Sequence, residues 1–146
     1  MSIFPNVNIY NEETQKVLPN TIGRTFLFNS QTGQLIFKDG KPVEVDYKQA
    51  AEQWIALFLR TELNKYNVYK STNFGMQDLY NLKGHNIVAN NYMQAEIKRE
   101  VTEKLEQCRF IKKVQNIQLD FSNNKLVINL TAVLEDGEVI VNEVVL

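Results

Sequence analysis

The sequence is poor in the residues that build disulfide frameworks and zinc sites. Its 146 residues include one cysteine and one histidine. One cysteine cannot form an intrachain disulfide, and a zinc site needs three or four nitrogen and sulfur ligands. We therefore expect a chain that folds without disulfides, metal or cofactor, in a reducing compartment.

Long apolar runs and an excess of charge of one sign are also missing. No stretch approaches the roughly 20 apolar residues of a membrane-spanning helix, and residues 1–10 lack the features of a secretory signal. The 16 Lys+Arg and 17 Asp+Glu residues leave a net charge of −1, which gives no overall attraction to nucleic acid or anionic membranes. We expect synthesis in the cytoplasm, and we expect no nucleic-acid partner and no binding to membranes.

The length suits one domain, with β-like patterns near its start. Residues 1–20 contain two prolines and several asparagines, so we expect an extended arm there and a single domain over 21–146. Short strand patterns occupy residues 25–28 and 34–37, and Asp39-Gly40 is typical of a hairpin turn.

Two amphipathic helices and a C-terminal β region follow. Asp46 suits the N-cap of a helix that runs to about Asn64, and a second helix is predicted from about Asn90 to Gln107. Strand patterns lie around residues 111–119, 126–131 and 139–146, and apolar residues alternate along the second of them. This order predicts an α+β fold: a small mixed or antiparallel sheet with an N-terminal β-hairpin, two main helices and C-terminal strands. We expect the apolar stripes of both helices to pack on a sheet of these C-terminal strands. The stripe residues are Tyr47, Ala51, Trp54 and Phe58 in the first helix and Met93, Ile97, Val101 and Leu105 in the second.

The last predicted strand is the main candidate for an interaction with another protein. Apolar residues fall on both of its faces, so it needs cover on both. It can lie inside the domain's own sheet or add to the sheet of a partner. Nearby negative charges favour a basic partner, and we expect a chain without residues 143–146 to stay folded but fail in assembly. The negative side chains are Glu135, Asp136, Glu138 and Glu143.

The residues that can carry chemistry do not form a recognisable catalytic pattern. His85 has no nucleophile elbow to serve and is interpreted as a polar loop residue. Cys108, beside Arg109, can have a lowered thiol pKa or be a small core residue. Three glutamates share one side of the second helix, interleaved with basic residues as on a solvated face, and we predict no enzyme. These are Glu96, Glu100 and Glu103.

A modest basic cluster lies between residues 98 and 113. It holds only one aromatic residue, Phe110, and no known nucleic-acid motif, so an acidic protein surface is favoured as its partner. The basic residues are Lys98, Arg99, Lys104, Arg109, Lys112 and Lys113.

An ordered series of short motifs runs through the middle of the chain. They are Asp39-Gly40, Trp54-Ile55, Leu59-Arg60-Thr61-Glu62, Tyr66-Asn67-Val68-Tyr69-Lys70-Ser71, Asn73-Phe74-Gly75-Met76 and Leu79. This series, together with Arg109-Phe110-Ile111, resembles that of XkdS-like phage-tail proteins. They are relatives of the baseplate wedge and sheath-initiator protein of contractile tails. The resemblance extends over residues 24–146.

The resemblance implies a structural protein in the baseplate of a phage, a defective prophage or a tail-like bacteriocin, made in the host bacterial cytoplasm. Such a protein joins the baseplate to the first sheath ring and initiates sheath assembly. Its implied partners are sheath subunits and other wedge or hub proteins of the particle, with no small-molecule substrate. Because the wider family has also been labelled lysozyme-like, a peptidoglycan-cleaving baseplate enzyme is the alternative.

One position departs from the family pattern. The family's Glu-Pro-Arg tripeptide after the second helix corresponds here to Gln107-Cys108-Arg109. The retained arginine can still bind carboxylates or carbonyls through its planar donors. The residues expected at protein interfaces are therefore Arg109, Glu138, Glu143, Val144, Val145 and Leu146.

Overall fold

A computed structural model of the protein describes residues 25–29, 31–82, 84–87, 89–137 and 139–146. The arm expected at residues 1–20 and the Glu138 side chain lie outside these residues. The elements in chain order are β1 (Phe37–Lys38), β2 (Lys41–Pro42), α1 (Tyr47–Arg60), the 3-10 helix η1 (Asn67–Tyr69), α2 (Asp78–Leu82), α3 (Asn91–Glu106), β3 (Ile111–Ser122), β4 (Lys125–Leu134) and β5 (Val139–Val145).

The C-terminal strands form an antiparallel sheet with the order β3-β4-β5. The side chains of the central strand β4 alternate between buried and more exposed positions, as its sequence pattern predicts. Asn123 and Asn124 in the turn before β4 have φ angles of 49° and 61°. Asparagine tolerates this left-handed conformation, which a two-residue hairpin turn requires.

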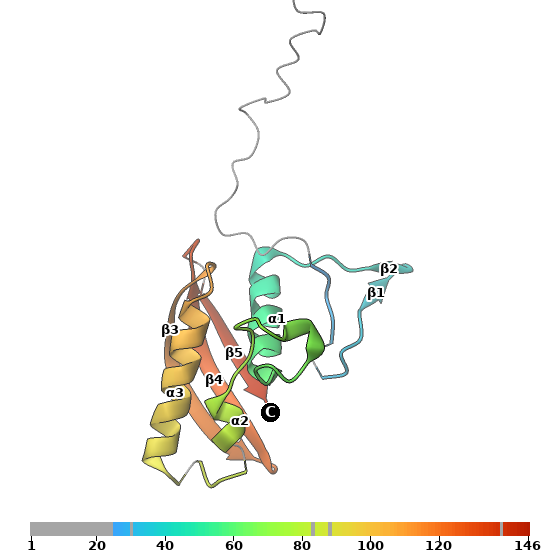
Figure 1. The fold of residues 1–146 in the computed structure, drawn as a ribbon. Helices are drawn as coiled ribbons and strands as arrows, with labels where there is room; N and C mark the ends of the chain where they lie inside the picture. The colour runs from blue at the N-terminus through green and yellow to red at the C-terminus, as the bar shows by residue number, and fades with distance from the viewer. Residues whose placement is uncertain (1–24, 30, 83, 88, 138) are drawn as a thin grey trace, which may run out of the picture.

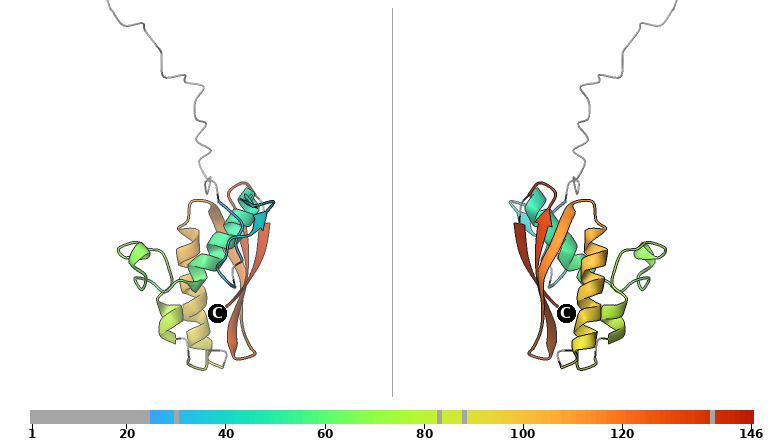
Figure 2. Two further views of the ribbon diagram at one scale, coloured as in Figure 1. Left: turned by 90° about the vertical axis from the view of Figure 1, so that its right-hand side faces the viewer. Right: turned by 90° about the vertical axis from the view of Figure 1, so that its left-hand side faces the viewer.

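The helices α1 and α3 lie on the same face of this sheet, and its other face is uncovered within the described residues (Figure 1, Figure 2). α1 packs against β5 and α3 against β3. In the α3 stripe Ile97, Val101 and Leu105 are fully buried, and Met93 is partly buried against the core. The same core cluster contains Ile55, Phe58 and β-strand side chains. The predicted packing of both helices on the C-terminal sheet, and the α+β class, are confirmed.

A side-chain cap begins α1, and a backbone hydrogen bond to a distant segment follows its end. The Asp46 carboxylate accepts from the Gln49 N–H at 2.8 Å, so the predicted N-cap of α1 is confirmed. α1 ends at Arg60, earlier than predicted. The chain leaves the helix there because the Thr61 carbonyl accepts from the Met76 N–H at 2.8 Å.

The N-terminal hairpin stands apart from the main sheet. Asp39 and Gly40 have φ angles of 52° and 74° and form the predicted turn between β1 and β2. The strands expected at 25–28 and 34–37 are shorter than predicted and include isolated bridges, such as Phe28 with Leu35. The hairpin projects from the body (Figure 1), and Phe37 is 59% exposed.

Two register shifts explain why the sequence of β3 has an irregular apolar pattern. Its pairing with β4 shifts register between Ile111 and Lys113, and again between Gln115 and Gln118. Asn116, inside the second shift, has a φ of 55°. Each extra residue interrupts the alternation of buried and exposed side chains, so the apolar residues cannot follow one period.

Candidate assembly interface

The strand β5 lies at an edge of the sheet, with its inner side bonded to β4. Val144 stands opposite Ile128, and the Leu146 N–H donates to the Leu126 carbonyl at 2.8 Å. In an antiparallel pair, residues that bond to the partner strand alternate with residues whose backbone groups point outward. The outward-pointing residues of β5 are therefore Val139, Val141, Glu143 and Val145.

One side chain is seen to reach this outer edge. Nη2 of Arg60 donates to the Val145 carbonyl at 3.2 Å. Within the described residues, no hydrogen bond reaches the outward backbone groups of Val141 or Glu143. An edge of this kind presents main-chain donors and acceptors to which a further strand can bind.

The side chains on one face of β5 are part of the protein's own core. Ile140 and Val144 are each 1% exposed, and Nδ2 of Asn142 donates to the Glu52 carbonyl of α1 at 3.1 Å. Of the two placements left open by the sequence, the strand adopts the one inside its own sheet. Contrary to the expectation from the sequence, removal of residues 143–146 should disrupt the fold, because it takes away a buried side chain.

The predicted interface residues do not form one cluster. Glu143 is exposed, whereas Val145 and Leu146 are half-buried near the end of β5. Arg109 is exposed in the turn between α3 and β3. The neighbouring Phe110 carbonyl accepts from the Glu135 N–H at 3.1 Å, so Arg109 lies near the β4–β5 turn, at the opposite end of β5 from Leu146.

A basic pocket beside the end of β5 was not predicted from the sequence. It has a volume of about 560 Å³, and its lining includes Arg60, Lys65 and Lys125 together with Val145 and Leu146. These side chains come from α1, the loop after it, β4 and the end of β5. Their separation along the chain gives no spacing pattern, so only the fold could reveal the pocket.

The rest of the lining of this basic pocket consists of Gln31, Tyr66 and Tyr80. The Tyr80 hydroxyl donates to the Leu59 carbonyl at 3.2 Å. Burial raises the pKa of Tyr80 to about 12, so its hydroxyl stays protonated at neutral pH. Tyr80 therefore adds no negative charge to the pocket wall.

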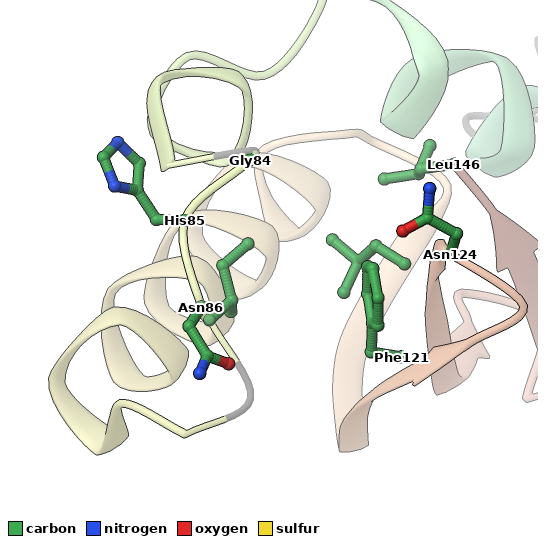
Figure 3. A pocket seen from close by; sticks show the side chains of 8 residues that line it. Gly84, His85, Asn86, Phe121, Asn124 and Leu146 are labelled. Atoms are coloured by element: carbon green, nitrogen blue, oxygen red, sulfur yellow. The ribbon is translucent and has the colours of Figure 1, made fainter.

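The only histidine lies on the rim of a different pocket, shown in Figure 3. This pocket has a volume of about 660 Å³ and lies between the loop of Gly84–Ile87 and residues Phe121, Asn124, Leu126 and Leu146. The imidazole of His85 points away from Phe121 (Figure 3). This arrangement places no acid or nucleophile beside His85 in the pocket lining.

Cys108 does not have the lowered pKa considered from its sequence neighbours. The thiol is half-buried, and this burial raises its pKa, outweighing hydrogen bonds from the Phe110 and Arg109 backbone and the charge of Arg109. A raised pKa leaves less thiolate, which is the reactive form. The interpretation of Cys108 as a small packing residue is the one that fits the structure.

The three glutamates of α3 bind groups of the protein itself. Glu96 and Glu103 both contact Arg99, at 2.8 and 2.9 Å. Glu100 is 4% exposed and accepts from the backbone N–H groups of Gln77 and Leu79, at 2.6 and 2.9 Å. Glu100 therefore ties α3 to the start of α2, whereas Glu96 and Glu103 pair within α3 itself.

We expect Glu100→Gln to lower the free energy of unfolding by about 1–3 kcal/mol, because the amide has one acceptor oxygen for two buried N–H donors. Denaturant midpoints measure the change. Glu103→Gln is the control on the same helix, since its carboxylate is exposed and should matter by less than about 1 kcal/mol. Equal midpoints for both variants would contradict the role of Glu100.

Among the described residues, no group of three or more His, Cys, Asp or Glu side chains is placed to hold a metal ion. Within the same residues, no helix has the length and apolar character needed to cross a membrane.

A model of the contractile injection system sheath initiator family matches residues 24–137. The chain belongs to this family. The match includes α1, α3, β3 and β4, and it ends just before β5. No protein in the curated comparison matches the chain.

Membership of the sheath initiator family gives the chain a structural role in a contractile injection system, and it confirms the resemblance read from the motifs. The family implies contacts with sheath and baseplate proteins and a place in the tail-like particle. The peptidoglycan-cleaving alternative gains no support from this family.

Proposed function

We propose that the protein joins the baseplate to the first sheath ring and initiates sheath assembly through the outer edge of β5. The observation that carries this proposal is the row of outward backbone groups on β5, which no described residue bonds between Val141 and Glu143. A strand from a sheath subunit would bind these groups and extend the sheet. The single domain proposed for residues 21–146 would then supply a ready-made template for the first ring.

A connecting protein also needs a second surface for the baseplate. The β1–β2 hairpin is suited to this role, because it projects from the body and exposes apolar side chains. Leu35, Ile36 and Phe37 are 48%, 39% and 59% exposed. Exposed apolar side chains favour burial against another protein. We propose that a wedge or hub protein covers this hairpin.

Glu143→Pro tests the strand-addition proposal. Its N–H points away from β4, so proline there removes no hydrogen bond within the sheet but blocks a strand arriving from outside. In a strain that carries only this variant, we expect tail tubes and baseplates without assembled sheath, as counted by negative-stain electron microscopy.

Glu143→Ala is the matched control, because it removes the same carboxylate and keeps the N–H. It should assemble sheathed particles. The purified proline variant must also keep the denaturant midpoint of the alanine variant, and Val141→Pro offers a second block of the same kind if it does not. Normal sheathed particles with a folded proline variant would refute strand addition at β5.

A further inference from the structure

The pocket beside the end of β5 combines positive charge with direct access to the strand edge. Arg60, Lys65 and Lys125 contribute three basic side chains to its lining, and no Asp or Glu lines it. Lys65 also pairs with the exposed Glu62 at 2.9 Å, which offsets part of this charge. Within the described residues, no salt bridge reaches Lys125. The pocket is therefore a positively charged recess.

Arg60 connects this recess to the edge of the sheet. Its guanidinium donates to the outward-pointing Val145 carbonyl, and the same side chain lines the pocket. A strand that runs along β5 and continues past Val145 would therefore meet Arg60, which also lines the recess. The recess is continuous with the surface proposed to bind the sheath subunit.

Acidic side chains also lie near this edge, but they do not make a second charged end. Glu135 and Asp136 are exposed in the turn before β5, where Arg109 lies close by, and Glu143 is exposed two residues before Val145. The recess, which no Asp or Glu lines, is therefore the part of this edge whose charge would discriminate between partner strands.

We propose that the strand which adds to β5 carries an aspartate or glutamate that enters the recess and pairs with Lys125 and Lys65. This inference rests on the proposed function, since it names the chemistry of the partner that the strand edge accepts. Arg60 is a positioning residue here, because it already holds the Val145 carbonyl.

The test uses overlapping synthetic peptides that cover the sheath subunit of the same particle, with binding to the full chain measured by fluorescence polarisation. The peptides that bind should contain an acidic residue at one end. Changing that acid to its amide should weaken binding by roughly tenfold, as two partly screened ion pairs would. Binding should also weaken as salt is raised.

A double-mutant cycle assigns the effect to the recess. The variant Lys65→Glu/Lys125→Glu should bind the acidic peptide at least tenfold more weakly than the wild type does. Its affinity for the amide peptide should be nearly unchanged. Lys65→Arg/Lys125→Arg should keep binding. Lys112→Glu/Lys113→Glu is the matched charge control, because these exposed lysines lie on β3 at the opposite edge of the sheet.

The outcomes separate this inference from the proposed function. Peptides that bind β5 with no acidic residue, or with equal losses for acid and amide forms, would overturn the acidic-partner inference and leave strand addition intact. Binding that Glu143→Pro does not reduce would overturn strand addition itself. All lysines changed here are exposed, so the variants should keep the wild-type denaturant midpoint.

Discussion

Gly75→Ala should destabilise the protein by about 2–6 kcal/mol, because the substitution adds steric overlap to backbone strain. A Cβ atom at this position would lie 2.7 Å from the Thr61 carbonyl oxygen and 3.0 Å from the Leu63 nitrogen. Both neighbours are backbone atoms, so neither can rotate away. The φ of Gly75 is 120°, a conformation that side chains of L-residues rarely adopt.

The close approach at Gly75 is needed for the pairing that ends α1. Met76 bonds to the Thr61 carbonyl and to the Leu63 N–H, at 2.8 and 3.0 Å. An alanine would push the two segments apart and weaken both bonds. We expect the loss to appear as a lower denaturant midpoint, and as a smaller yield of folded protein.

Gly137→Ala separates strain from overlap. Gly137 has a φ of 87°, but no atom lies within 4 Å of the position that its Cβ would take. It should therefore show only the strain, about 1–2 kcal/mol. If the two alanine variants lose equal stability, the contact between Gly75 and the segment after α1 does not matter to the fold.

The sequence predicted those elements whose signals are local. The cap at Asp46, the hairpin turn at Asp39-Gly40 and the α3 stripe each depend on residues close together in the chain, and each is confirmed. The alternation along β4 is confirmed for the same reason. A pattern with one period within one element needs no knowledge of the rest of the fold.

The sequence could not predict features that depend on distant contacts. The hydrogen bond between Met76 and Thr61 ends α1 at Arg60, and no residue pattern near Asn64 predicts this earlier end. Glu100 looks like part of a charged helix face, yet it is buried because Gln77 before α2 and Leu79 in the first turn of α2 each present an N–H group to it. The apolar residues of β5 did not indicate which edge of the strand pairs with β4.

The candidate interface was predicted only in part. The sequence singled out Val145 and Leu146 at the end of β5, but it offered no reason to join them to Arg60 or Lys125. Those contacts exist because α1 crosses β5 and the β3–β4 hairpin brings Lys125 to the same end of the sheet. The residues adjacent in the chain do not predict that α1 crosses β5.

Trp54→Ala should lower the free energy of unfolding by about 3–5 kcal/mol, because the indole joins three parts of the fold. Its ring stacks on Phe58 of α1 at 4.9 Å between ring centres. It also meets Phe74 and Phe110 edge-on at 5.7 and 5.0 Å, which links α1 to the loop before α2 and to the start of β3.

The loss of Trp54 would leave a cavity that three rings cannot fill, since Phe74 is itself held by stacking on Tyr69 at 4.5 Å. Denaturant midpoints measure the effect. Tyr92→Ala is the control, because Tyr92 is 72% exposed on α3 and its removal should cost less than about 0.5 kcal/mol. A wild-type midpoint for Trp54→Ala would mean that the indole is a surface group, and that α1 is held to the sheet by its aliphatic side chains alone.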